Sequence, residues 1–528
     1  MTGWLRRWLL LSAAVGGLGL VLSACGKRDE ADRAPPAAVA GVPFTVLAGS
    51  ELRDIEPVLL KAAQGAGVTL MLSYAGVLDI VERVNAGERF DAILPANGAY
   101  PALALTDKAL AREKLFYSRV VLGVKPAKAK LLGWDEKAPT WADIASAAGD
   151  GRLQYAMTNP TSSNTGMSAL FAVASAVAGK TEDLQAKEVD AKVLTAFLAG
   201  QKLTAGSSGW LADAFVKDPS ALDAMVNYEA VILRSNAKLL PADRLMLIHP
   251  QDGVITADYP LMLLNADKRE GYAKLVAAFK SPAAQAELAT DAFLRPAVAG
   301  VALANGLSAA PVAELSFPNR LEVIDAVLAA YQGEWRRPAT SIFVLDVSGS
   351  MEGDRLEAMR AALKILAGAD ARAASSRYAR FQSRERVVLM TFADRVNAPV
   401  QVNFDSAALD AARSRVTAYA DGLAAKGGTG IYAAIIKAQA LAASERQRDP
   451  DRYVSIVLLT DGENTAGPDL AAFEAQLAGG TSARVFPILF GEANADDMKT
   501  LAQLTGGRVF DGRKAGLSLV FKEIRGYQ

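Results

Sequence analysis

Apolar and polar positions alternate with two different periods along most of the chain. Short apolar runs at 44–48 (F-T-V-L-A), 68–74 (V-T-L-M-L-S-Y) and 90–94 (F-D-A-I-L) predict strands. Between them, residues 55–63 and 78–85 carry apolar side chains at the three- and four-residue spacing of a helix. Strands that alternate with helices are typical of βαβ units, so the pattern predicts an α/β fold with largely parallel sheets.

The last third of the chain repeats this alternation with longer apolar runs. S-I-F-V-L-D (341–346) and V-S-I-V-L-L-T-D-G (454–462) predict buried strands. A helix is expected after the first of them, and its apolar face carries Leu356, Met359, Leu363 and Leu366. This helix would anchor the preceding loop against the sheet.

A break separates the two patterns. Residues 319–331 have helical spacing, and G-E-W-R-R-P-A-T (333–340) then interrupts the pattern before the next strand. We therefore expect one folded region at 42–310, a helical linker at 311–337 and a second domain at 338–528.

The first residues have the pattern of a targeting segment. An apolar run follows Arg6 and Arg7 and ends in L-S-A-C, where Cys25 is the one cysteine of the chain. A basic start, a short apolar stretch and small residues before a cut site predict a secretory signal over 1–24. A charged, Pro- and Ala-rich tether should follow over 25–41.

The L-S-A-C sequence resembles the bacterial lipobox. The resemblance implies that Cys25 becomes the first mature residue and carries lipid, palmitate included. The protein would then lie in the cell envelope, facing the periplasm or the cell exterior, and would reach the membrane through its lipid anchor alone. An uncleaved N-terminal helix with an incidental cysteine is the alternative.

The composition narrows the function classes. Lys and Arg together number 57, as do Asp and Glu, so no net field favours nucleic acid. One cysteine and one histidine cannot build a zinc cluster. A histidine-based catalytic triad would have to use His249, which we expect to be a hydrogen-bonded structural residue beside a strand.

Oxygen-bearing side chains gather at predicted strand ends in the second domain. D-V-S-G-S-M places Asp346, Ser348 and Ser350 at alternate positions just past a strand, and Asp461 ends another strand. Thr429 lies in the Gly-rich loop K-G-G-T-G before a helix. Parallel sheets bind ligands at this C-terminal edge. Two carboxylates and three hydroxyls favour Mg²⁺, with Mn²⁺ or Ca²⁺ as alternatives.

The D-x-S-x-S loop, the loop threonine and the strand-end T-D-G resemble the metal-ion-dependent adhesion site of the von Willebrand factor A (VWA) family. The resemblance implies a doubly wound, Rossmann-like domain in which Ser348, Ser350 and Thr429 contact the metal. Asp346 and Asp461 would contact it directly or through water. One coordination position would be left for an acidic residue of a partner protein.

The first region resembles a type II bacterial periplasmic solute-binding protein, a group that includes molybdate- and sulfate-type binders. L-A-G-S-E-L, F-D-A-I-L-P-A-N, T-N-P-T-S-S-N-T-G, V-N-Y-E-A-V-I-L and D-G-V-I-T-A-D-Y-P-L carry this resemblance in order. It implies two α/β lobes with a ligand clamped between them. Lobe 1 would contain 42–125 and 245–310, and lobe 2 would contain 126–244.

By position, the resemblance implies a cleft lined by Ser50, Glu51, Ala75, Gly76, Thr161, Ser162, Ser163, Asn164 and Tyr228. Hydroxyls and backbone N–H groups there suit a small solute or an oxyanion. Glu51 departs from an anion site and favours a cation-bearing solute instead. The hydroxyl-rich loop could equally serve as a helix N-cap. A scaffold that binds no solute is a further alternative.

These patterns favour a binding protein, and we expect no enzyme. The metal-site serines have no base beside them, which argues against the alternative of a metal-dependent hydrolase. The other alternative is the solute receptor of an ABC-type importer, with the VWA domain as an accessory.

Overall fold

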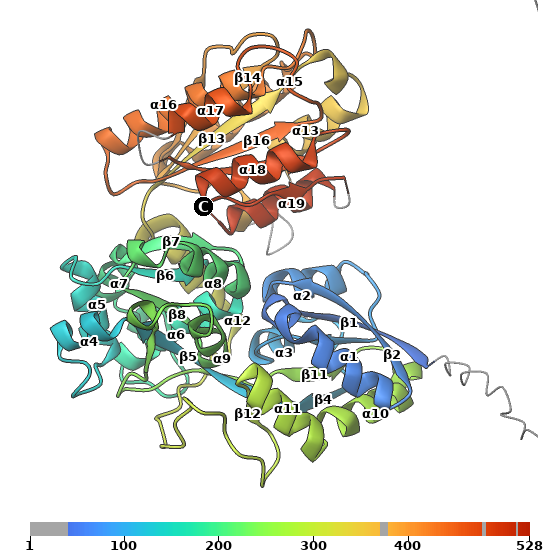
Figure 1. Ribbon diagram of the computed structural model, residues 1–528, viewed down its shortest axis with the longest axis vertical. Coiled ribbons are helices and arrows are strands. Elements are labelled where there is room, and N and C mark those ends of the chain that lie inside the picture. Colours follow the sequence, from blue (N-terminus) through green and yellow to red (C-terminus); the bar gives the residue numbers. More distant parts are fainter. Residues whose placement is uncertain (1–40, 370–377, 478–481, 514–515, 528) are drawn as a thin grey trace, which may run out of the picture. The chain divides into compact units, whose positions relative to one another are not determined.

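A computed structural model describes residues 41–369, 378–477, 482–513 and 516–527 (Figure 1). The predicted signal, Cys25 and nearly all of the tether lie outside these residues. From Gly41 onward the chain packs as one unit. Its described strands form three sheets, one for each predicted lobe and one for the C-terminal domain. The expected α/β architecture is confirmed.

Lobe 1 is built on a mixed sheet of strand order β2-β1-β3-β11-β4. β1 (Val42–Gly49) pairs in parallel with β2 (Val68–Ala75) and β3 (Ala92–Leu94), whereas β11 (Pro260–Leu263) runs antiparallel to β3 and β4 (Ala111–Lys114). The lobe therefore combines two distant stretches of sequence, and Figure 1 shows the lime helices α10 and α11 beside its blue strands. Its helices are α1 (Glu56–Gly65), α2 (Val77–Asn85), α3 (Ala99–Ala104), α10 (Arg269–Phe279) and α11 (Pro282–Ala292).

Lobe 2 is organised around one long strand, β5 (Phe116–Val124), which is buried over most of its length. The other strands of its sheet are β6 (Tyr155–Thr158), β7 (Gln201–Ala205), β8 (Ala224–Tyr228), β9 (Met246–Ile248), β10 (Thr256–Ala257) and β12 (Arg295–Pro296). The helices are α4 (Pro126–Leu132), α5 (Trp141–Gly149), α6 (Asn164–Val177), α7 (Ala191–Ala199), α8 (Ser208–Lys217) and α9 (Glu229–Asn236).

The crossovers between the lobes differ from the predicted ones near 125 and 245. β5 pairs with β8, β9, β10 and β12, so the chain enters the lobe 2 sheet at Phe116, leaves it after Ala257 and returns to it only at the short strand β12. An apolar run predicts a buried strand but carries no information on its partners. The predicted lobe boundary at 125/126 therefore put β5 in lobe 1, whereas its pairing puts it in the lobe 2 sheet.

The C-terminal sheet has the order β15-β14-β13-β16-β17-β18, and its neighbours are parallel except for the β14–β15 pair. The strands are β13 (Ala339–Asp346), β14 (Glu385–Phe392), β15 (Val400–Phe404), β16 (Tyr453–Thr460), β17 (Arg484–Leu489) and β18 (Phe510–Asp511). The helices are α13 (Asp354–Leu366), α15 (Leu409–Asp421), α16 (Ile431–Arg448), α17 (Leu470–Leu477), α18 (Ala495–Thr505) and α19 (Leu517–Arg525).

Both faces of this sheet are covered by helices. Alternate residues of β13 enter different cores: Phe343 packs in the core that contains α13, α15 and α19, while Ile342 packs in the core that contains α16 and α17. A strand buried on both faces reads as a continuous apolar run, which explains the S-I-F-V-L-D pattern. The predicted doubly wound arrangement is confirmed.

The predicted linker is helical. α12 (Leu321–Ala330) continues into a π-helical turn, Tyr331–Trp335. Gln332 Nε2 in that turn donates to the side-chain hydroxyl of Thr161 in lobe 2 (2.8 Å). The linker therefore holds the loop that precedes α6.

Candidate functional site

The C-terminal edge of the last sheet begins with Asp346, the final residue of β13. This carboxylate is fully buried; its Oδ1 accepts from the N–H of Ser348 (2.8 Å) and its Oδ2 accepts from the hydroxyl of Thr460 (2.7 Å). Burial raises the pKa of Asp346, and the hydrogen bonds from Ser348 and Thr460 oppose that rise. Both oxygens are thus held in fixed positions.

A second carboxylate meets the D-x-S-x-S loop from the adjacent strand. β16 pairs directly with β13, so Asp461, one residue past its end, emerges beside the loop. The Ser350 hydroxyl donates to Asp461 Oδ1 (2.8 Å), and the hydroxyls of Ser348 and Ser350 lie 3.1 Å apart. The predicted carboxylates and serines therefore form one connected group.

Thr429 approaches the same point from the Gly-rich loop. Its N–H donates to Thr465 Oγ1 (2.9 Å), which fixes the loop. A Cβ atom at Gly462 would lie 3.7 Å from Thr429 Oγ1 and 3.8 Å from Ser350 Oγ, so both hydroxyls flank Gly462. The structure thus brings together all five residues that the sequence singled out: Asp346, Ser348, Ser350, Thr429 and Asp461. We call them the metal edge, after the cation that the sequence predicts there.

Arg355 also reaches the metal edge and was missed by the sequence analysis. Its Nη1 pairs with Asp461 Oδ2 and donates to the carbonyl oxygen of Ser350 (3.3 Å). No local spacing signals this ion pair, because Arg355 belongs to α13 and Asp461 follows β16. With one guanidinium for two carboxylates, the group keeps a net negative charge, and its oxygen donors fit a hard divalent cation.

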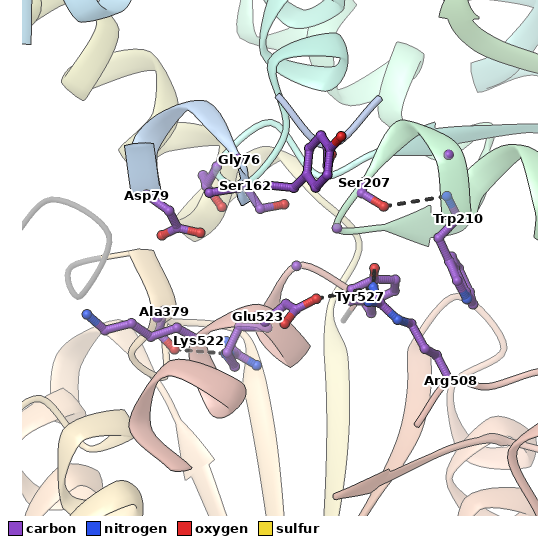
Figure 2. A pocket seen from close by; sticks show the side chains of 18 of the residues that line it. Gly76, Asp79, Ser162, Ser207, Trp210, Ala379, Arg508, Lys522, Glu523 and Tyr527 are labelled. Atoms are coloured by element: carbon purple, nitrogen blue, oxygen red, sulfur yellow. Dashed lines mark hydrogen bonds and ion pairs between the residues drawn. The ribbon is translucent and has the colours of Figure 1, made fainter. Parts of the chain in front are cut away.

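The cleft residues divide into two sets. Ser50, Ala75, Gly76, Thr161 and Ser162 line a cavity of ≈ 440 Å³ (Figure 2). At its edge the lobes touch, because a Cβ atom at Gly76 would lie only 2.0 Å from the carbonyl oxygen of Ser162. A glycine is required here for the close approach of the two backbones.

The second set is buried and does not line that cavity: Glu51, Ser163, Asn164 and Tyr228. Asn164 Nδ2 donates to the Tyr228 hydroxyl (3.0 Å). Glu51 Oε1 and Asn164 Oδ1 are buried and have no hydrogen-bond partner among the described residues. Burial raises the pKa of Glu51 to about 7.

Asn159 organises the hydroxyl-rich loop and was not singled out from the sequence. Its Oδ1 accepts from the N–H (2.9 Å) and the hydroxyl (2.8 Å) of Thr161, which also accepts from Gln332. The Thr161 hydroxyl is therefore engaged within the protein. The N-P-T order was the available signal, since an asparagine commonly bonds to the backbone two residues on.

Comparisons with known proteins follow the same division of the chain. Residues 44–294 match a family model described as bacterial extracellular solute-binding protein, and residues 341–463 match one described as von Willebrand factor type A domain. The chain joins a solute-binding domain to a VWA domain.

Solved structures resemble one domain or the other. The ferric binding protein from Campylobacter jejuni is 14% identical, covers 54% of this chain and 96% of its own, and has a TM-score of 0.40. The periplasmic binding protein AfuA from Actinobacillus pleuropneumoniae is 11% identical, with coverages of 55% and 97% and a TM-score of 0.43. A von Willebrand factor type A structure from Catenulispora acidiphila is 21% identical, with coverages of 36% and 42% and a TM-score of 0.29.

A curated relative adds sequence similarity without a function. An uncharacterized protein of Mycobacterium tuberculosis is 35% identical over 138 residues, which is 26% of this chain. The match spans 19% of that relative's length.

The single histidine lies in the solute-binding domain, away from the metal edge. His249 Nε2 is 2.6 Å from Glu229 Oε1, and Arg295 donates to both oxygens of Glu229 (2.7 and 2.8 Å). Burial alone would raise the pKa of Glu229, but the hydrogen bonds from Arg295 and His249 bring it down to about 2. His249 is hydrogen-bonded, as expected of a structural residue.

The described part of the chain holds neither a helix that could span a membrane nor a cluster of acidic, histidine and cysteine side chains. None of the helices there has the length and apolar character needed to cross a membrane. None of the side chains described there gather as three or more His, Cys, Asp or Glu suited to a metal ion. The metal edge has two carboxylates, so a cation there would also need the hydroxyls of Ser348, Ser350 and Thr429.

Proposed function

We propose that this chain is a non-enzymatic binding protein of the cell envelope. Its VWA domain grips a partner protein through a divalent cation, Mg²⁺ or alternatively Mn²⁺ or Ca²⁺, and its solute-binding domain holds a small solute. A lipid on Cys25 anchors the protein to the membrane.

The observation that carries the metal-dependent grip is the convergence of the five oxygen-bearing side chains at one edge of the VWA sheet. Asp346, Ser348, Ser350, Thr429 and Asp461 would hold the cation. When bound, the cation supplies a Lewis-acid centre that an acidic side chain of a partner can reach. The protein's own part is to keep these side chains in place, through the Ser348 N–H, Thr460 and the Thr465 hydroxyl.

Capture of partners from a membrane extract tests this grip. The mature chain would serve as bait with Mg²⁺, with a chelator, and as Asp346→Ala, with Asp405→Ala as the control because Asp405 is exposed and distant from the metal edge. We expect one partner to be retained by the wild type and the control in Mg²⁺ only. Equal retention in all four samples would refute the metal-dependent grip.

A specific observation supports the solute: the cleft residues of both lobes border one cavity of ≈ 440 Å³. That volume lies within the range of small-molecule sites. The same observation favours the second candidate, the solute receptor of an ABC-type importer. A transporter retained by the bait regardless of metal would support the receptor, whereas a metal-dependent partner supports the VWA grip.

The anchor has its own test. Metabolic labelling with radioactive palmitate should mark the wild type and leave Cys25→Ser unlabelled. Label on both would place the lipid elsewhere, and label on neither would refute the lipid anchor.

A further inference from the structure

The end of the VWA domain contacts both lobes of the solute-binding domain. We call residues 522–527 the C-terminal segment. Lys522 Nζ pairs with Glu82 Oε1 of lobe 1 (3.0 Å), and both side chains are largely buried, with 16% and 20% exposed. In lobe 2, Asn159 Nδ2 donates to the carbonyl oxygen of Arg525 (3.4 Å). One short stretch thus bridges the two lobes.

The segment fits closely against lobe 2. The ring of Tyr527 meets that of Trp210 edge to face, with centroids 4.8 Å apart. A Cβ atom at Gly206 would lie 2.6 Å from Tyr527 Cε2, and one at Gly526 would lie 2.8 Å from Ser162 Oγ. There is no space for an added side chain between the segment and this lobe.

The cavity of ≈ 440 Å³ is therefore bordered on three sides. Figure 2 shows Gly76 and Asp79 of lobe 1 and Ser162, Ser207 and Trp210 of lobe 2 opposite Lys522, Glu523 and Tyr527 of the VWA domain. The volume is measured with the segment in place. A small solute can thus be enclosed without displacing it.

The charged side chains that line the cavity differ in whether they are paired. Four of its cationic side chains are paired with carboxylates: Arg83 with Glu88, Arg508 with Glu523, Lys522 with Glu82, and Arg525 with Glu385. The fifth, Arg53, lies over the ring of Tyr74 at 5.1 Å. Asp79 forms no hydrogen bond or ion pair within the described residues, so its carboxylate is available to a ligand.

Aromatic side chains complete the wall. Tyr74, Trp210 and Tyr527 line the same cavity as Asp79. Carboxylates combined with aromatic faces bind organic cations through charge pairing and cation–π contact. An oxyanion would instead be repelled by Asp79, and Arg53, the one lining cation without a carboxylate partner among the described residues, is already directed at Tyr74.

We infer that the C-terminal segment is the third wall of the solute site, and that this three-walled site holds a small organic cation against Asp79. This rests on the proposed solute-binding function and specifies its ligand class. The VWA domain thereby takes part in solute binding directly, through residues outside the metal edge.

The test uses the full mature chain and isothermal titration with spermidine, L-arginine and choline as cations, and with inorganic phosphate and citrate as anions. Burial raises the pKa of Asp79 to about 6, with Glu82 adding to the rise, so titration at pH 8 keeps Asp79 ionised. We expect at least one cation to bind, and Asp79→Asn to weaken it roughly tenfold or more through loss of a charge-assisted bond.

A larger side chain at Gly206 tests whether the C-terminal segment forms part of the solute site. Gly206→Val should push Tyr527 away and weaken the cation roughly tenfold. Gly65→Val is the matched control, because Gly65 lies outside the cavity lining and a Cβ atom there meets nothing within 4 Å.

The possible results distinguish the third wall, the ligand class and the solute-binding function from one another. Unchanged binding in Gly206→Val would overturn the third wall and leave the solute function standing. Binding of phosphate or citrate without any cation would overturn the ligand class while again preserving the solute function. No response to any of the three cations would overturn the inference itself, and native mass spectrometry for a co-purifying solute would then decide the solute function separately.

Discussion

The metal edge and the inter-lobe cleft use similar oxygen-bearing side chains but build their sites differently. The metal edge takes its residues from one sheet, where β13 and β16 are direct neighbours and every carboxylate oxygen named above has a partner. The cleft takes its residues from two lobes and leaves Glu51 Oε1 and Asn164 Oδ1 without a hydrogen-bond partner among the described residues.

This difference indicates which of the two sites has its side chains ordered before a ligand binds. Paired oxygens at the metal edge keep their positions before any ligand arrives, which reduces the cost of ordering them on binding. Unpartnered buried oxygens are costly unless a ligand or a rearrangement satisfies them. The metal edge is held in place by its own hydrogen bonds, whereas Glu51 and Asn164 lie behind the cavity lining and each keep one oxygen without a partner among the described residues.

The largest expected effect concerns the fold around the cleft. Arg295→Met leaves the buried Glu229 without its bidentate partner, which should lower the free energy of unfolding by about 3–5 kcal/mol. Urea unfolding at pH 7 checks this, with the exposed Arg269→Met as the control. Equal stability of the two variants would mean that His249 alone balances Glu229.

The same pair predicts an acid dependence. The pKa of Glu229 is about 2 in the folded chain, below its ordinary 4.5. Its ionised carboxylate therefore adds to the free energy of unfolding above pH 4.5, and this contribution is lost as the pH falls towards 2. The free energy of unfolding, measured at a series of pH values between 5 and 2, should therefore fall less steeply for Arg295→Met than for the wild type.

At the metal edge, Ser350→Ala should weaken Mg²⁺ or Mn²⁺ binding by about 10- to 100-fold. The hydroxyl is both a proposed ligand and the donor to Asp461 Oδ1. Titration calorimetry measures the loss, and Ser406→Ala, an exposed serine of the same domain, should bind normally. Wild-type affinity in Ser350→Ala would show that the hydroxyls do not take part.

In the cleft, Glu51→Gln should stabilise the protein at high pH. Burial raises the pKa of Glu51 to about 7, so the wild type loses stability as the pH rises from 4.5 to 7 and the variant does not. The gain should be about 3 kcal/mol at pH 8 and small at pH 5. Unfolding monitored at both values measures it, with the exposed Glu136→Gln expected to show neither change.

The smallest expected effect concerns the ion pair between Arg355 and Asp461 at the metal edge. Arg355→Ala removes a positive charge paired with Asp461, so a divalent cation should bind about two- to fivefold more tightly. Arg360→Ala, on the same helix but paired with Glu357, should bind as the wild type does. Weaker binding in Arg355→Ala would mean that Arg355 orders the loop instead of competing with the metal.

The sequence was sufficient to bring Asp346, Ser348, Ser350 and Asp461 together because these residues lie next to strand ends, whereas Thr429 was located by its Gly-rich loop. A strand end fixes the edge, and the adjacent β13 and β16 then bring Asp346 and Asp461 together without any long-range information. Arg355 could not be predicted, because its partner lies across the sheet edge on another element.

The cleft was predicted less completely. Position along the chain located Ser50, Gly76 and Ser162 at the cavity, but Glu51 and Tyr228 were not separable from them, since burial depends on how the lobes meet. The sheet to which β5 belongs was assigned wrongly for the same reason. Contacts between sheets depend on packing that no local pattern records.

The divided sequence of lobe 1 has a consequence for how the protein is made. β3 ends at Leu94, but the strand that covers its free edge, β11, begins only at Pro260. The 165 residues between them (95–259) take a ribosome about 10–30 s to synthesise. Throughout that interval the edge of β3 cannot find its native neighbour, and an open strand edge invites pairing with other chains. The nascent protein is thus prone to aggregate through the edge of β3 during this interval. A chaperone that binds extended segments would protect it.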